Sequence, residues 1–225
     1  MKVSIINYGL SNLLSVKRAV EKLGFEAVIA DTAQQVREAW VLILPGVGAF
    51  ADGMQGLMER DMLQPIWGCA ESGVPILGIC LGMQMLFDSS REYGLHRGLG
   101  LIPGHVERIP GRSSNGSQLA VPHIGWAALE PAQATQQAFS PSILQHVQPG
   151  EEVYFVHSFA AKPRNRQDIS AVCQYGGHKL CAAVEKENIY GAQFHPEKSG
   201  AVGLRILSAF LQQATAKQAG MQILV

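Results

Sequence analysis

The segment Gly78-Ile79-Cys80-Leu81-Gly82 constrains the fold of this chain more than any other stretch. An apolar run from Val74 to Ile79 predicts a buried strand before it, and Leu81 to Phe87 predicts a helix after it. A nucleophile between glycines at a strand-to-helix turn is the pattern of a nucleophile elbow, in which a Cβ in place of either glycine would clash with backbone. The turn is expected to place the Cys80 sulfur at a helix N-terminus, which favours a thiolate.

A second interpretation of Cys80 stays open from this segment alone. Most lone cysteines are small buried residues of a core, so the elbow pattern needs catalytic partners elsewhere in the chain. The other three cysteines, Cys69, Cys173 and Cys181, have apolar neighbours and lack the pair of glycines that marks a sharp turn at Cys80, so we expect them to be core thiols.

Short apolar segments alternate with helical patterns in the first half of the chain, which predicts a parallel sheet with right-handed crossovers. Strands are expected at 2–7, 25–30, 41–44 and 74–79, and helices at 11–24, with Ser11 as N-cap, and at 31–38, capped by Asp31-Thr32. The second half predicts a meander of strands at 151–156, 169–174, 180–185 and 189–194, closed by a helix at 201–212.

The predicted fold class is therefore α/β, with an open, mostly parallel central sheet flanked by helices and additional antiparallel strands in the second half. We expect residues 1–216 to form one domain and residues 217–225 to form a C-terminal tail of unknown role. Ligands of such sheets bind at the carboxyl ends of the strands, where Cys80 and the loop Pro45 to Gly48 both fall.

Charge and composition argue against several function classes, although a balanced charge still allows a local basic patch. The chain has 18 basic and 18 acidic residues, and this balance argues against a nucleic-acid partner or a charged membrane surface as partner. The start Met1-Lys2-Val3-Ser4 runs straight into a strand, and no apolar run is long enough to cross a bilayer. We therefore expect a cytoplasmic protein whose cysteines are thiols.

The loop Pro45-Gly46-Val47-Gly48 allows two interpretations. Gly46-x-Gly48-x-x-Ala51 formally fits a dinucleotide fingerprint, but the next strand ends at Cys80 and not at the acidic residue that would bind ribose. The preferred interpretation is a backbone segment beside the thiol whose N–H groups bind an oxyanion. The Leu81 N–H, directly after the nucleophile, is one predicted donor, and a backbone N–H of Val47 or Gly48 is the second.

The segment His195-Pro196-Glu197 supplies the expected partners of Cys80. Pro196 disfavours a helical conformation at His195, and in an extended segment residues two apart project to a similar side. Glu197 can then accept a hydrogen bond from one ring nitrogen of His195, while the other nitrogen faces the sulfur as general base. We expect no metal, because neither His-Glu-x-x-His nor paired Cys-x-x-Cys spacing occurs.

Further motifs lie along the chain beside the two segments around Cys80 and His195. The blocks are Ile6-Asn7-Tyr8-Gly9 with Asn12-Leu13, Pro45-Gly46-Val47-Gly48-Ala49-Phe50, Gly78-Ile79-Cys80-Leu81-Gly82-Met83-Gln84, Pro122-His123-Ile124-Gly125-Trp126, Tyr154-Phe155-Val156-His157-Ser158 and Gly191-Ala192-Gln193-Phe194-His195-Pro196-Glu197-Lys198-Ser199. Through these blocks, from Met1 to about Leu211, the chain resembles class I glutamine amidotransferases, and among them the glutaminase subunits of imidazole glycerol phosphate synthase. The departures from that pattern are Asn7 for an acidic residue, Ser11 for glycine and Ala127 for asparagine.

The resemblance implies the class I glutamine amidotransferase fold and hydrolysis of L-glutamine through a γ-glutamyl thioester on Cys80, with no cofactor. It also implies which residues hold the substrate, with the Glu92 carboxylate suited to the α-ammonium group and Ser158 and Phe159 acting mainly through backbone. The glutamine-binding residues implied in this way are Gly48, Gln84, Glu92, Ser158 and Phe159.

The resemblance further implies a heterodimer with a (β/α)8-barrel cyclase, which uses the ammonia to make imidazole glycerol phosphate and AICAR in histidine biosynthesis. Residues implied to lie toward that partner are Asn12, Trp126, Tyr154 and Lys198. Other hypotheses remain open: an amidotransferase for another synthase, such as one for sugar amination, a stand-alone Cys-His hydrolase, and an inactive assembly or regulatory subunit.

Overall fold

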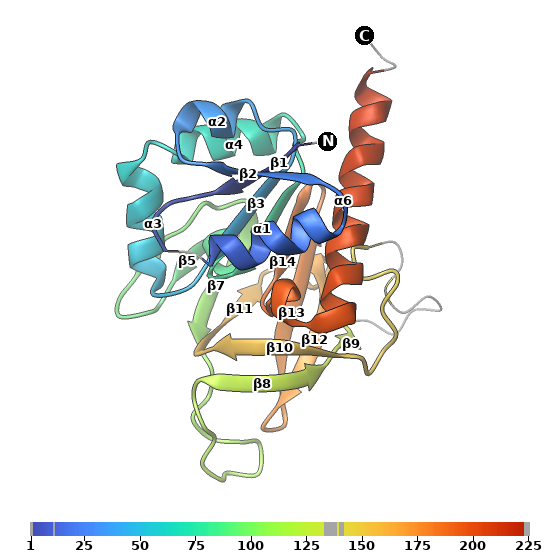
Figure 1. Cartoon of the computed structure of the whole chain (residues 1–225). Coiled ribbons are helices and arrows are strands. Elements are labelled where there is room, and N and C mark those ends of the chain that lie inside the picture. Colours follow the sequence, from blue (N-terminus) through green and yellow to red (C-terminus); the bar gives the residue numbers. More distant parts are fainter. Residues whose placement is uncertain (1, 11, 133–138, 140–141, 223–225) are drawn as a thin grey trace.

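The computed structural model describes residues 2–10, 12–132, 139 and 142–222, and an eight-stranded sheet forms its centre (Figure 1). The strands of this sheet are β1 (Lys2–Ile6), β2 (Glu26–Ala30), β3 (Leu42–Gly46), β4 (Ile76–Cys80), β9 (Glu130–Pro131), β12 (Ile169–Tyr175), β13 (His178–Lys186) and β14 (Ile189–Ala192). Their order in space is β2-β1-β3-β4-β14-β13-β12-β9. The strands from β2 to β14 pair in parallel, and those from β14 to β9 pair antiparallel. The predicted α/β fold with antiparallel strands in the second half is confirmed.

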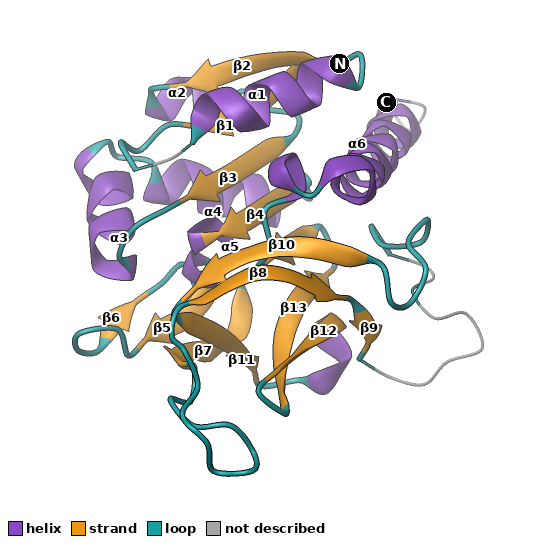
Figure 2. Cartoon of the chain, turned by 60° about the horizontal axis from the view of Figure 1, so that its bottom comes forward, coloured by secondary structure: helices purple, strands orange, loops and turns teal. Residues whose placement is uncertain are grey.

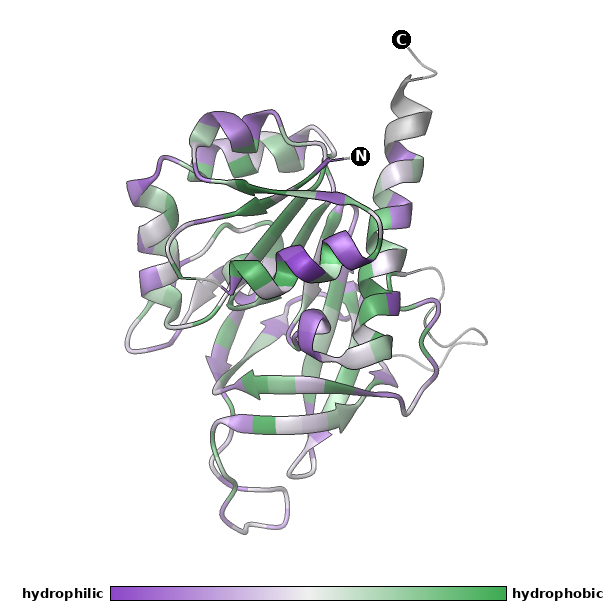
Figure 3. Cartoon of the chain, viewed as in Figure 1, coloured by the Kyte–Doolittle hydropathy of each residue, from purple (hydrophilic) through white to green (hydrophobic). Residues whose placement is uncertain are grey.

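Helices cover both faces of the sheet (Figure 2). On one face lie α1 (Leu13–Lys22) and α6 (Gly200–Gln222), and on the other lie α2 (Ala33–Arg37), α3 (Phe50–Glu59), α4 (Leu63–Glu71) and α5 (Leu81–Met85). Because side chains alternate along a strand, Ile43 of β3 packs with α1 and α6, whereas Leu42 and Leu44 pack with the other helices. Burial on both faces explains the continuous apolar runs of the central strands, which are green in Figure 3.

Two smaller sheets come from the middle of the chain. A four-stranded sheet contains β5 (Phe87–Ser90), β6 (His96–Arg97), β7 (Ile102–Arg108) and β11 (Phe159–Pro163). A two-stranded ribbon pairs β8 (His123–Ala128) with β10 (Glu152–His157), and it lies below the main sheet in Figure 1. Short 3-10 turns are η1 (Arg166–Asp168) and η2 (Pro196–Lys198).

Several predicted elements differ from the structure. The four segments predicted as one meander divide, because 152–157 pairs with β8 while β12, β13 and β14 join the main sheet. The helix predicted to reach Phe87 ends at Met85, because Phe87 begins a strand. The last helix does not stop at Gln212 but continues to Gln222, so the first residues of the predicted tail are helical.

The predicted helix caps have different outcomes. Thr32 caps α2 and forms a reciprocal capping box with Gln35, as its position before the helix predicts. Ser11, predicted to cap α1, lies outside the described residues. Asn12 occupies the N-cap position of α1 without a side-chain hydrogen bond to the helix backbone.

The three cysteines expected in the core are buried free thiols. Burial raises the pKa of Cys69, of Cys173 to about 12, and of Cys181, so these sulfurs are poor nucleophiles. Of the helices in the part of the chain that the structure describes, none has the length and apolar character needed to cross a bilayer.

Candidate active site

Cys80 ends β4 directly before α5, in the strand-to-helix turn that the sequence predicts. Its backbone lies at φ 54° and ψ −110°, a conformation that non-glycine residues rarely adopt and that is common at functional sites. A Cβ at Gly82 would lie 1.7 Å from the Leu44 carbonyl oxygen, and one at Gly78 would lie 2.7 Å from the backbone of Gly82. Both glycines are therefore required for the close approach of β3, β4 and α5.

His195 and Glu197 form a buried pair beside this turn. His195 follows β14, and β14 pairs in parallel with β4, so both residues emerge at the same edge of the sheet as Cys80. The His195 ring lies 2.9 Å from Glu197, between Nδ1 and Oε1, and the two side chains are 2% and 1% exposed. His195 is extended as predicted, whereas Glu197 lies in the turn η2 and still reaches the imidazole.

The electrostatics of the pair favour an imidazolium. Burial opposes a charge on His195, but interactions with Cys80 and with the Glu197 carboxylate outweigh it and raise the pKa of His195 to about 9. No hydrogen bond of normal geometry joins the sulfur to the ring in this conformation. The thiol instead points to the Val156 carbonyl oxygen at 3.8 Å, and Nε2 of His195 is buried without a partner among the described residues. Nε2 is thus the ring atom left to exchange a proton.

A cavity of ≈ 270 Å³ opens beside Cys80. Its walls bring together the five residues implied to hold glutamine and the three predicted to supply oxyanion donors. The lining residues are Val47, Gly48, Cys80, Leu81, Gln84, Glu92, Pro122, Val156, His157, Ser158 and Phe159. Three of these residues, Pro122, Val156 and His157, had no predicted role in the site.

Two polar side chains of the cavity are fixed by other parts of the fold. Gln84 Nε2 donates to the Phe159 carbonyl oxygen at 2.9 Å, which joins α5 to β11. Glu92 Oε2 accepts from the Phe50 N–H at 2.7 Å, at the start of α3. The Glu92 carboxylate therefore gives the cavity an anchored negative group of the kind that an ammonium requires.

The predicted oxyanion donors are in different states. The Val47 N–H donates to the Leu10 carbonyl oxygen at 3.2 Å, so it is occupied in this conformation. Gly48 has φ +109°, a region that favours glycine, and its N–H is the remaining candidate from this loop. Leu81 follows the nucleophile at the first position of α5, where the elbow pattern places a donor.

Two buried histidines next to the cavity were not identified from the sequence. His157 Nδ1 lies 2.8 Å from the Phe159 carbonyl oxygen, which only accepts, so this nitrogen carries the proton and Nε2 accepts from His123 at 3.2 Å. Burial lowers the pKa of His123 and, as the largest effect, that of His157 to about 4. The pair depends on the register of β8 with β10, which no local sequence pattern reveals.

The residues implied to face a partner lie on β8, on β10, on η2 and directly before α1; β10 contacts both β8 and η2, and η2 contacts α1. Trp126 is 53% exposed and lies edge-on to Tyr154, at 6.0 Å between ring centroids, across the β8–β10 ribbon. Lys198 is exposed in η2, and Asn12 precedes α1. Exposed apolar side chains on these elements include Leu14, Ile124 and Trp126.

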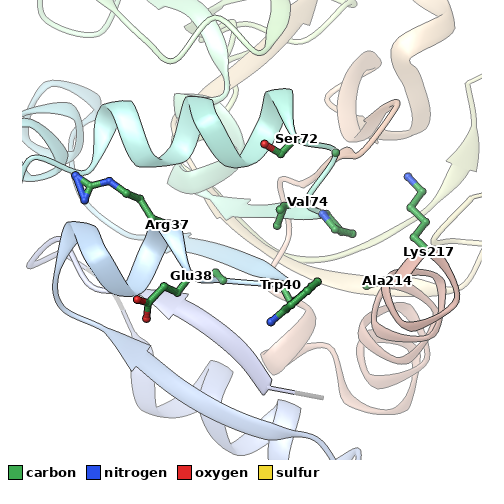
Figure 4. A pocket seen from close by; sticks show the side chains of 10 residues that line it. Arg37, Glu38, Trp40, Ser72, Val74, Ala214 and Lys217 are labelled. Atoms are coloured by element: carbon green, nitrogen blue, oxygen red, sulfur yellow. The ribbon is translucent and has the colours of Figure 1, made fainter. Parts of the chain in front are cut away.

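A larger cavity, of ≈ 530 Å³, lies at the opposite end of the parallel strands. Figure 4 shows Trp40, Arg37 and Lys217 around it, on segments that precede β3 or belong to α2 and α6. Its lining contains neither a thiol nor an imidazole. Among the described residues, no three histidine, cysteine or acidic side chains are grouped to hold a metal ion.

Comparisons with known proteins identify the family of the chain. The family model "Glutamine amidotransferase class-I" matches residues 4–214. The chain is 46% identical over 210 residues to "Imidazole glycerol phosphate synthase subunit HisH 1" of Legionella pneumophila (strain Lens), covering 93% of this chain and 98% of that protein. It is 48% identical over 209 residues to the HisH subunit of Geobacter metallireducens, covering 92% and 96% of the two chains.

Solved structures show the same fold at lower identity. A crystal structure described as a glutamine amidotransferase matches with a TM-score of 0.70 at 20% identity, covering 95% of this chain and 98% of that one. The PurLQS structure from Thermotoga maritima matches with a TM-score of 0.66 at 21% identity, covering 94% and 98%. The chain therefore belongs to the class I glutamine amidotransferases and, within them, to the family of HisH subunits of imidazole glycerol phosphate synthase.

Proposed function

We propose that this protein hydrolyses L-glutamine to glutamate and ammonia at Cys80 and delivers the ammonia to a synthase subunit in histidine biosynthesis. The observation that carries the proposal is the buried His195–Glu197 pair at the sheet edge where Cys80 opens onto a cavity of ≈ 270 Å³. The names of the HisH relatives support the pathway, and the presence of a nucleophile, a base and an orienting carboxylate in one place supports the reaction class.

In the first step the Cys80 sulfur attacks the side-chain amide carbon of glutamine. His195 holds the proton taken from the thiol and donates it to the departing nitrogen, so that ammonia leaves and a γ-glutamyl thioester remains. A pKa of about 9 keeps His195 protonated at neutral pH until the leaving group needs the proton. Glu197 orients the ring and stabilises the imidazolium.

In the second step His195, now neutral, takes a proton from water, and the hydroxide attacks the thioester carbon. Glutamate leaves and the sulfur is regenerated with His195 protonated again. In both steps the carbonyl oxygen carries a negative charge, which the Leu81 N–H and the Gly48 N–H stabilise. Loss of one such donor typically costs about 2.7–4 kcal/mol in kcat. Rotation of the loop peptide between 47 and 48 would therefore switch the reaction on and off.

The ammonia acceptor in this proposal is a (β/α)8-barrel cyclase bound as a heterodimer in the cytoplasm, which makes imidazole glycerol phosphate and AICAR. The exposed Trp126, with Tyr154, Asn12 and Lys198 on neighbouring elements, is the surface that would receive it. Exposed tryptophans of this kind are frequent anchors of protein interfaces.

The test is glutamine hydrolysis by the purified complex with the cyclase, and by Cys80→Ala, His195→Ala and Glu197→Ala. We expect no turnover in the first variant and a strong stimulation of the intact protein by the cyclase and its ligand. The glutamine-mimicking electrophile diazo-oxo-norleucine should add to Cys80, as measured by intact mass. Full turnover of Cys80→Ala contradicts the reaction, and an unchanged rate with the cyclase contradicts the partnership.

A further inference from the structure

The side chain of Gln193 is fully buried beside the nucleophile Cys80. The proposed glutaminase reaction gives Gln193 no role. It follows β14 directly, and the parallel register pairs Ala192 with Ile79, so the next step along both strands brings Gln193 beside Cys80. The Gln193 N–H donates to the Ala182 carbonyl oxygen at 2.9 Å, which fixes the backbone from which the side chain projects.

The side chain of Gln193 connects the sulfur to the substrate cavity. Gln193 Nε2 lies 3.8 Å from Cys80 Sγ, and Gln193 Oε1 accepts from Gln84 Nε2 at 2.9 Å. Gln84 Nε2 donates its other hydrogen to the Phe159 carbonyl oxygen. A continuous chain of hydrogen bonds therefore runs from β11 through α5 to the nucleophile.

A backbone carbonyl fixes the direction of this chain. The Phe159 oxygen can only accept, so it faces the NH2 group of Gln84 and not its oxygen. Gln193 must then turn its own oxygen to Gln84 and its NH2 group to the sulfur. Two consequences follow: Cys80 always faces a donor, and the Gln84 oxygen is the atom left for the cavity.

The donor acts differently on the two forms of Cys80. The neutral thiol has an acceptor of its own, since it points to the Val156 carbonyl oxygen. The thiolate cannot donate to that oxygen and needs donors, and Gln193 Nε2 is one that is already in place and shielded from water. Hydrogen bonds to charged groups are stronger than those between neutral groups, more so in a buried site.

We propose that Gln193 is a positioning residue with two linked actions: it donates to the Cys80 thiolate, and it holds Gln84 with its oxygen toward the substrate. This inference rests on the proposed glutaminase reaction but concerns how the site is prepared before glutamine binds. It follows that the reactivity of Cys80 depends on Gln193 even in the absence of glutamine.

Two substitutions separate the two actions. Gln193→Met has a similar volume and loses both the donor and the acceptor. Gln193→Glu has the same shape and keeps an acceptor for Gln84, but presents a carboxylate to the sulfur in place of a donor. Gln212→Met is the matched control, because Gln212 is exposed on α6 and its side chain bonds only to Ser208 in the part of the chain described.

The first measurement is the rate of Cys80 alkylation by iodoacetamide as a function of pH, without glutamine. We expect both Gln193 variants to need a higher pH for half-maximal alkylation and the control to match the parent protein. We expect kcat for glutamine to fall about tenfold in Gln193→Met, the loss typical of one hydrogen bond to a charged group. Only Gln193→Met should also raise KM, because Gln193→Glu retains the partner of Gln84.

Near-UV circular dichroism identifies the variants that fold. If Gln193→Met does not fold, the alkylation profile of Gln193→Glu decides the outcome. As a measurement that needs no Gln193 variant, the NMR signals of the Gln193 side-chain NH2 group should move with pH in the parent protein and stay constant in Cys80→Ser. The proposal is overturned by unchanged alkylation profiles in folded Gln193 variants. It is also overturned if the NH2 signals of Gln193 depend on pH in the same way in the parent protein and in Cys80→Ser. Because alkylation does not require glutamine, the two proposals can fail separately. An absence of glutaminase activity would contradict the proposed function but would not change the meaning of the alkylation profiles.

Discussion

Replacing Glu197 by glutamine tests how far the Glu197 carboxylate stabilises the proton on the His195 ring. The difference between a pKa of about 9 for His195 and its ordinary value of 6.5 corresponds to about 3 kcal/mol. Cys80 and Glu197 share this effect, so Glu197→Gln should remove about half of it, which is about tenfold in the acid–base step. The variant keeps the volume of a side chain that is 1% exposed, so folding should survive.

The pH dependence gives the sign of the effect. In the parent protein His195 remains an imidazolium, able to donate to the leaving nitrogen, up to pH about 9. Without the Glu197 charge the ring loses its proton at lower pH. The alkaline limb of kcat/KM for glutamine should therefore move to lower pH, and kcat should fall by at least about tenfold.

The assay is glutamate production across pH in the complex with the cyclase. The matched control is Glu185→Gln, which alters a half-buried carboxyl group at the opposite end of β14, whose pKa burial raises to about 7. That variant should keep the alkaline limb of the parent protein. An alkaline limb that does not move in Glu197→Gln, together with a rate within about twofold of the parent, would refute the role of the carboxylate.

Three further outcomes follow from the geometry. Gly82→Ala should destabilise the fold by more than about 3 kcal/mol in urea melts, because the added Cβ meets the Leu44 carbonyl oxygen. The control Gly68→Ala, which has open space in α4, should stabilise the fold by about 0.5–1 kcal/mol, and equal effects of the two variants would contradict the packing argument. The pKa of His157 is lowered to about 4, chiefly by burial, so its contribution of about 3 kcal/mol to the free energy of unfolding is present above pH 6.5 and lost as the pH falls to 4. In His157→Gln the melting temperature should therefore fall less steeply between pH 6.5 and 4, and an unchanged slope argues against a buried neutral ring. Trp126→Ala should keep the melting temperature but weaken cyclase binding by about 2 kcal/mol in calorimetry, while Trp40→Ala, equally exposed at the other end of the strands, should not; a match between the two would remove Trp126 from the interface.

Much of the site was predictable because its parts lie in short segments with strong local constraints. Gly78 and Gly82 mark the elbow, since side chains at those positions would enter neighbouring backbone. Pro196 keeps His195 extended, and the His195 ring meets Glu197 only two residues further along the chain, in the turn η2. Gln84, Glu92, Ser158 and Phe159 were predicted only through the family resemblance, and in the structure they line one cavity with Cys80.

Element boundaries were less predictable where two patterns compete. Leu81 to Phe87 is apolar throughout, so the sequence does not mark where α5 ends and β5 begins. The strand at 152–157 looks like its neighbours in sequence, but its partner, β8, lies more than twenty residues upstream. Pairing over such distances depends on the packing of the whole chain.

Local patterns were enough to predict the parallel sheet, the elbow at Cys80 and the imidazole–carboxylate pair, because alternation, glycine sterics and proline geometry act over a few residues. Which polar atoms face the sulfur and the cavity depends on how the whole chain folds. The pairing of His123 with His157, the occupied Val47 N–H and the orientation of the Gln193 amide all depend on contacts between segments far apart in the chain. Hydrogen bonds have direction, and direction is fixed only when donor and acceptor are brought together by folding.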